Sequence, residues 1–176
     1  MAQQVAFFLC IPLAVLVHEF GHALATWQVG GQVLEFQWRG FWGYVVPYGT
    51  FSQLEFWWIA LAGNLASLLV AIAVLLVGVN IQRHIVGQIL TAFGLLEFTF
   101  AMVLYPIMSF AIPDFTGDWV RIYQFSVAPY AQFVLTLHLI AIAIFYKIQR
   151  PIRLRAMTHV QLPPQLKNQS TPIDEP

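Results

Sequence analysis

The sequence contains little charge. Only 9% of its 176 residues are Asp, Glu, Lys or Arg, and 59% are hydrophobic, whereas an ordinary soluble domain is about 25% charged. Eight basic residues balance eight acidic residues, so the basic surface that nucleic-acid binding requires is missing. The composition therefore predicts a membrane protein and argues against a nucleic-acid-binding one.

Cysteine is almost absent as well. The single residue, Cys10, can form neither an internal disulfide nor a cysteine-based zinc ribbon or redox motif. The N-terminus also lacks the positively charged region of a cleavable signal peptide, and its apolar run is longer than a signal core. We therefore expect the first apolar segment to be retained as a membrane span.

Four apolar segments are long enough to cross a bilayer, which takes about 20 helical residues. They predict an all-α polytopic membrane protein, a bundle of about four transmembrane helices within a core of residues 1–150. The expected spans are residues 5–27, 53–79, 85–111 and 129–146. Residues 151–176 contain prolines, amides and few large apolar side chains, so we predict a polar, disordered tail.

The segment between the first two spans, residues 29–50, has the pattern of a β-hairpin. Gly30 and Gly31 interrupt the first helix, and Arg39-Gly40 can form a turn between two short runs rich in Val, Phe, Trp and Tyr. Because these runs are largely apolar, we expect a short hairpin associated with the membrane. Alternation of the spans would place Arg39 at the membrane face where the first span ends.

The first span contains His18-Glu19-Phe20-Gly21-His22. Residues four apart lie one helical turn and about 6 Å apart, so His18 and His22 can bind one ion. In this pattern the ion is zinc, and Glu19 acts as the general base on a water molecule. Ionisable side chains within a membrane helix are costly, which further indicates a functional site. We predict one Zn²⁺ per chain.

A catalytic zinc has three protein ligands and an open position for water. The candidates for the third ligand are Asp114, Asp118, Glu97 and His138. The two aspartates lie in a break that reaches the membrane face near His22. Glu97 and His138 lie within spans, so we interpret them as residues that support the ligands or as polar contacts between helices.

Residues 18–22, followed by Val29-Gly30-Gly31, resemble the site-2 protease family of intramembrane zinc metalloproteases. The second family motif is Leu-Asp-Gly-Gly-Arg-Ile, and residues 118–122, Asp-Trp-Val-Arg-Ile, are similar to it at the Asp, Arg and Ile but lack the glycines. The resemblance implies that Asp118 is the third ligand, with Asp114 as the alternative.

Residues 62–67, Ala-Gly-Asn-Leu-Ala-Ser, resemble a third family motif, Ala-Gly-Pro-Leu-Ala-Asn. Asn64 stands in place of the proline, and Ser67 stands in place of the asparagine. Asn64 either stabilises a reaction intermediate or forms a hydrogen bond between helices. The small residues permit close helix packing.

The resemblance implies an intramembrane zinc endopeptidase that cleaves in or near the transmembrane segment of a membrane-protein substrate. An edge strand within residues 32–46 would hold the substrate extended. We expect a multi-pass protein in the lipid bilayer of the cell membrane, with a separate regulatory partner. The alternative is a non-catalytic metal-binding scaffold, or pseudoprotease, that binds transmembrane helices. Glu19 argues against this alternative because a scaffold does not need a general base.

Overall fold

The computed structural model describes residues 2–112, 117–124 and 130–158. The chain divides into two compact units, residues 1–138 and 139–176. The elements in chain order are α1 Ala2–Val5, η1 Ala6–Cys10, α2 Ile11–Gln28, β1 Gln32–Trp38, β2 Gly43–Tyr48, α3 Gln53–Asn80, α4 Ile85–Thr99, η2 Phe100–Leu104, α5 Tyr105–Ala111, α6 Asp118–Gln124 and α7 Tyr130–Thr158. The predicted class, a helical membrane protein with a β-hairpin after the first helix, is confirmed.

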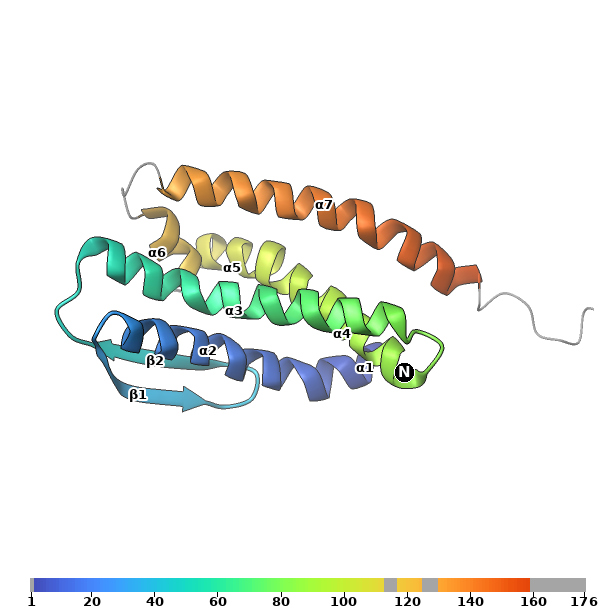
Figure 1. The fold of residues 1–176 in the computed structure, drawn as a ribbon, viewed down its shortest axis with the longest axis horizontal. Helices are drawn as coiled ribbons and strands as arrows, with labels where there is room; N and C mark the ends of the chain where they lie inside the picture. Colours follow the sequence, from blue (N-terminus) through green and yellow to red (C-terminus); the bar gives the residue numbers. More distant parts are fainter. Residues whose placement is uncertain (1, 113–116, 125–129, 159–176) are drawn as a thin grey trace, which may run out of the picture. The chain divides into compact units, whose positions relative to one another are not determined.

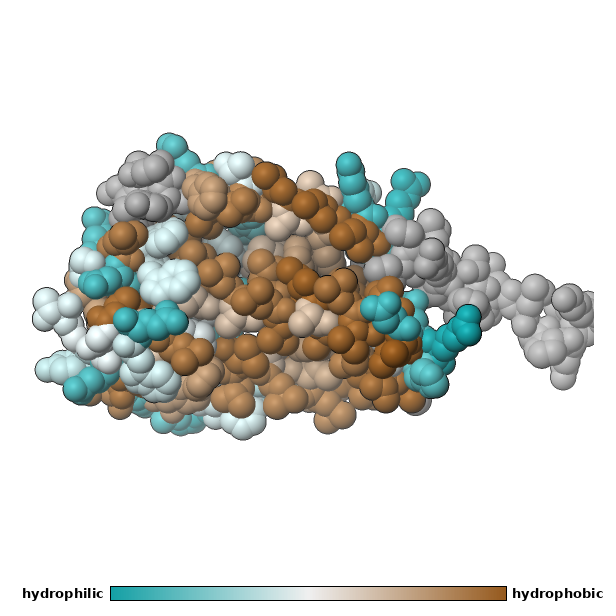
Figure 2. Space-filling model, viewed as in Figure 1, coloured by the Kyte–Doolittle hydropathy of each residue, from teal (hydrophilic) through white to brown (hydrophobic). Residues whose placement is uncertain are grey.

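Four helical segments are long and apolar enough to cross a membrane, and they make the chain an integral membrane protein. They are Ala6–Gln28, Gln53–Asn80, Ile85–Ala111 and Gln132–Arg150. Apolar side chains cover the middle of α2 and α3 on the face seen in Figure 2. The last helix, α7, continues to Thr158 and thus enters the segment predicted to be a disordered tail. Residues 159–176 lie outside the described part of the chain.

Local sequence signals determine where α2 ends and α3 begins. Gly30 has a φ of +79°, a left-handed conformation that a glycine adopts without strain, and the N–H of Gly31 donates to the Thr26 carbonyl at 2.9 Å. Ser52 and Glu55 form a capping box at the start of α3, which satisfies N–H groups that would otherwise lack partners. The chain can therefore reverse between the two helices through the hairpin.

The hairpin pairs β1 with β2 in antiparallel register, with Gln37 opposite Tyr44 and a bulge between Val33 and Glu35. Its turn contains Gly40 at a φ of +78°. Among the described residues, the sheet has these two strands alone. Each strand therefore has an outer edge without a sheet partner.

The hairpin turns back along α2 instead of extending away from its end, and Figure 1 shows both strands beside this helix. The indole N–H of Trp38 donates to the carbonyl of Pro12 at 2.8 Å, and the Phe41 ring lies 5.6 Å from the Phe7 ring. Pro12 is sixteen residues before Gln28, which is about 24 Å along a helix. The expectation that Arg39 lies at the membrane face where the first span ends is therefore wrong.

Close packing of α2 on α3 depends on small residues. A Cβ atom at Gly21 would lie 2.7 Å from the Ala62 carbonyl oxygen and 3.0 Å from the Cα of Gly63. Both distances are too short for an added carbon, so the two backbones touch at this point. This contact brings α2, the helix that carries the predicted metal motif, directly against α3.

The third membrane segment contains a change of helical type. A π-helix, η2, lies between α4 and α5 and ends two residues before Pro106. Such π-turns are frequent near functional sites because they redirect side chains and carbonyl groups. Here the Met102 carbonyl, within η2, accepts a hydrogen bond from Nε2 of His138 at 2.6 Å.

Candidate metal centre

His18 and His22 lie one turn apart on α2, and their rings face the same point. Their Nε2 atoms are 3.1 Å apart, and the ring planes are nearly perpendicular at 84°. His22 is buried and His18 is half-buried. The predicted spacing therefore brings two imidazole nitrogens together.

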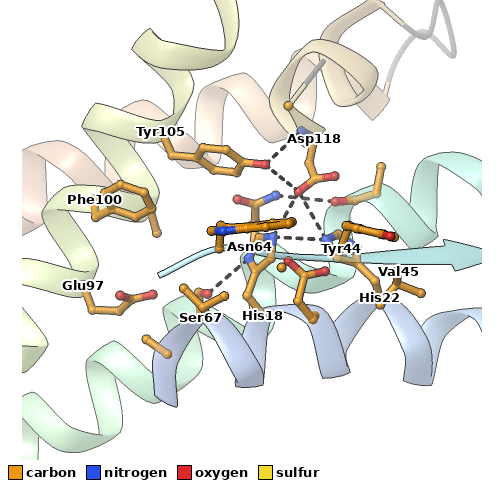
Figure 3. Close-up of a pocket in the computed structure, with 18 of the residues that line it drawn as sticks. His18, His22, Tyr44, Val45, Asn64, Ser67, Glu97, Phe100, Tyr105 and Asp118 are labelled. Carbon is orange, nitrogen blue, oxygen red and sulfur yellow. Dashed lines mark hydrogen bonds and ion pairs between the residues drawn. The ribbon is translucent and has the colours of Figure 1, made fainter. Parts of the chain in front are cut away.

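Asp118, the first residue of α6, supplies a third donor atom (Figure 3). Its Oδ2 lies 3.0 Å from His18 Nε2 and 3.2 Å from His22 Nε2. In a tetrahedral zinc site with bonds of 2.0–2.1 Å, the ligand atoms are about 3.3 Å apart. The triangle formed by these three atoms is close to that size, and two imidazoles with a carboxylate are a zinc-type donor set. The three residues therefore fit a zinc ion.

Charges around Asp118 favour its ionised form. Burial alone would raise the pKa of this carboxyl group, but the charges of His22 and His18 and their hydrogen bonds outweigh it and hold the pKa well below its usual range. The Tyr105 hydroxyl also donates to Oδ2 at 2.9 Å, and the Asp118 N–H donates to the Tyr105 oxygen at 3.2 Å. An ionised and oriented carboxylate is the form that binds a metal ion.

A backbone carbonyl group orients the His22 ring. The Nδ1 atom lies 2.7 Å from the carbonyl oxygen of Ile59. Because a carbonyl can only accept, Nδ1 must carry a proton, so the lone pair of a neutral His22 ring is on Nε2, toward the triangle. The ring also packs on Gly63, where a Cβ atom would overlap it. This support is typical of metal-binding histidines.

Glu19 is buried beside the triangle, with 6% of its surface exposed. Its side chain passes close to Gly43 of β2, where a Cβ atom would lie 2.8 Å from the Glu19 Cγ. Both residues and the three donors line one cavity of about 620 Å³. Side chains from α2, β2, α3, α4, η2, α5 and α6 contribute to its walls. The carboxyl group predicted to act as a general base therefore shares a space with the metal donors.

The other predicted site residues divide into two groups. Asn64 and Glu97 line the same cavity, and the Asn64 Oδ1 is buried without a hydrogen-bond partner. His138 lies elsewhere, stacked on Trp119 at 4.5 Å. Asp114, the alternative ligand, lies outside the described residues.

His138 forms a contact between helices. Its Nε2–H donates to Met102, so Nδ1 accepts the Tyr123 hydroxyl group at 2.8 Å. Burial raises the pKa of Tyr123 to about 12, so its hydroxyl group keeps its proton and remains a donor. These contacts hold α6, which begins with Asp118, against η2 and the start of α7.

Tyr105 was not identified from the sequence, although its hydroxyl group contacts Asp118. It is a single tyrosine at the end of an apolar span, next to Pro106. A proline that breaks a span is the signal that could have drawn attention to its neighbour. The contact itself depends on the tertiary position of α6.

The fold and the site together define a polytopic membrane protein with a two-histidine, one-aspartate candidate metal centre. The family model described as Peptidase M50B-like matches residues 8–170, and the chain belongs to this family. The family resemblance inferred from the motifs is thus confirmed, and a membrane metallopeptidase is the kind of protein that it indicates. Neither the curated proteins nor the solved structures gave a match.

Proposed function

We propose that this protein is an intramembrane zinc endopeptidase, which hydrolyses a peptide bond in or near a transmembrane segment of a membrane-protein substrate in the cell membrane. The observation that carries the proposal is the triangle of His18, His22 and Asp118 with the buried carboxyl group of Glu19 in the same cavity. A purely structural polar cluster has no need for this combination of donors and base.

A zinc ion held by the triangle would supply a Lewis acid that polarises the scissile carbonyl group and lowers the pKa of water. Glu19 takes up the proton as water attacks the carbonyl carbon, and then delivers it to the leaving amine nitrogen. Asn64 lines the cavity, and its buried Oδ1 has no hydrogen-bond partner. This oxygen accepts a hydrogen bond from a peptide N–H of the substrate. Each role belongs to a side chain that lines the cavity.

The substrate segment would bind in an extended conformation. Gly43, Tyr44, Val45 and Pro47 of β2 line the cavity, so an unwound substrate segment can pair with this strand while its scissile bond lies near the donors. A helical segment hides its peptide groups in internal hydrogen bonds, so local unwinding must come before attack. The hairpin thus binds the substrate, and a separate membrane protein would regulate access.

Metal analysis of the detergent-purified protein tests the metal site. We expect about one zinc per chain in the wild type and in Glu19→Gln, and loss of zinc in Asp118→Ala. Asp114→Ala is the control and is expected to keep its zinc. A folded wild type that binds no zinc after reconstitution would refute the proposal.

Hydrolysis is tested with a panel of single-span peptides that carry a fluorophore and a quencher on either side of the apolar segment. We expect the zinc-loaded wild type to cleave members of the panel, and Glu19→Gln to cleave none of them. Equal signals from the two proteins would show that Glu19 is not the base. A wild type that binds both zinc and the peptides but cleaves none would favour the pseudoprotease alternative.

A further inference from the structure

The two histidines of the candidate metal centre are oriented by different kinds of acceptor. His22 Nδ1 faces the carbonyl group of Ile59, which can only accept a hydrogen bond. His18 Nδ1 faces the hydroxyl group of Ser67 at 3.3 Å, which can either accept or donate. Ser67 therefore does not by itself determine which nitrogen of His18 carries the proton.

Glu97 lies behind Ser67 and removes this ambiguity. Its side chain lines the same cavity as Ser67 and His18, and Figure 3 shows the row of three side chains from α4, α3 and α2. Ser67 and Glu97 are buried, with 3% and 4% of their surfaces exposed. In its ionised form Glu97 is an acceptor only, so this carboxylate takes the single hydroxyl proton of Ser67.

The direction of the remaining hydrogen bond then follows. A Ser67 hydroxyl group that donates to Glu97 can only accept from His18, so Nδ1 of His18 must carry the ring proton. The lone pair of a neutral His18 is then on Nε2, the atom that lies 3.0 Å from Asp118 Oδ2. The row thus gives His18 the tautomer that the Ile59 carbonyl group gives His22.

We infer that Ser67 and Glu97 are positioning residues, which together fix the tautomer and ring orientation of His18 for metal binding. The inference deepens the proposed function and rests on its metal site. Glu97 acts through Ser67, and neither residue is a metal ligand. Such outer contacts typically change metal affinity by about 10- to 100-fold when they are removed.

Zinc affinity of the full-length, detergent-purified protein, measured by competition with a chromophoric chelator, tests the inference. We expect Ser67→Ala to weaken zinc binding by about 10- to 100-fold, and Glu97→Gln to have a smaller effect. Ser67→Thr keeps the hydroxyl group and is expected to restore most of the affinity. Thr91→Val, which removes another buried hydroxyl group in α4 outside the cavity, is the control and is expected to bind zinc like the wild type.

The double variant Ser67→Ala/Glu97→Gln tests whether Glu97 acts on His18 through Ser67 or independently of it. If Glu97 acts through Ser67, adding Glu97→Gln to Ser67→Ala will weaken zinc binding no further. The absorption spectrum of the Co²⁺-substituted protein supplies a second measurement. A reoriented His18 in Ser67→Ala is expected to change its ligand-field bands. Wild-type affinity in Ser67→Ala, or independent effects that multiply in the double variant, would overturn the inference. A wild type that binds no zinc would instead overturn the proposed function itself.

Discussion

The contact between His22 and Gly63 gives a quantitative prediction for Gly63→Ala. A Cβ atom at this position would overlap Nε2 of His22 and lie 2.5 Å from Cε1 and 2.8 Å from Cδ2 of the same ring. Restoring an ordinary contact of 3.4 Å from 2.5 Å requires the ring to retreat by about 0.9 Å. Zinc–nitrogen distances in functional sites vary by only about 0.2 Å. The ring therefore cannot make room and remain a ligand.

Separation of α2 and α3 would relieve the overlap only at a cost in stability. The backbones of α2 and α3 already touch at Gly21, and separating them would open the packed contact with Ala62. Overpacking of this kind costs about 1–3 kcal/mol. Gly63→Ala will therefore either lower the stability of the protein or displace the His22 ring. Loss of the contacts that orient a metal ligand typically weakens metal binding by up to about 100-fold. We expect Gly63→Ala to weaken zinc binding by at least that factor.

Chelator competition and thermal unfolding in detergent measure the two outcomes together. Gly78→Ala is the matched control, because a Cβ there would lie 2.5 Å from the Thr91 nitrogen and 2.7 Å from its Oγ1. Gly78 is fifteen residues from Gly63 on α3, about 22 Å along the helix, so this variant is expected to lose stability and keep one zinc. Unchanged zinc affinity in Gly63→Ala would show that the ring does not occupy its described position when metal is bound.

Two further variants test the supports of α6. Tyr105→Phe removes the hydroxyl group that lies 2.9 Å from Asp118 Oδ2, and we expect about tenfold weaker zinc binding by chelator competition; an unchanged affinity would show that this contact does not orient the ligand. His138→Gln disturbs the hydrogen bonds to Met102 and Tyr123, so we expect a free energy of unfolding lower by about 1–3 kcal/mol with one zinc retained. Loss of zinc at unchanged stability would instead place His138 among the ligands.

The helical framework was predictable because it depends on local properties of the sequence. A bilayer sets a length and an apolar composition for a span, and the run before Gly30 and the runs on either side of Asn80 satisfy both requirements. His18 and His22 were predictable for the same reason, since their separation is a property of one helix. Asp118 is 96 residues from His22. The order of the spans placed both Asp114 and Asp118 near His22, and the resemblance of residues 118–122 to a family motif favoured Asp118.

Contacts between helices could not be derived in this way. Ser67 reaches His18, and Glu97 reaches Ser67, only because α3 lies between α2 and α4 at a particular rotation. Hydrophobic periodicity gives little information on rotation here, because a membrane helix is apolar on nearly all sides. The sequence marked Glu97 as costly in a membrane, but it could not identify the partner that offsets this cost.

The position of the hairpin bears on how a water-dependent reaction can occur within a bilayer. Backbone that is not helical survives at membrane depth only where it is buried in protein or lines a watery cavity. The contacts of Trp38 with Pro12 and of Phe41 with Phe7 place the hairpin turn beside η1 and the start of α2, within the first membrane segment. Its second strand lines the cavity that contains Glu19. Under the proposed function, water solvates the peptide groups of this strand when no substrate is bound, and an extended substrate replaces that water. The backbone N–H and C=O groups of β2 would then be hydrogen-bonded either to water or to the substrate. The same strand would admit water to Glu19 and hold the segment to be cut.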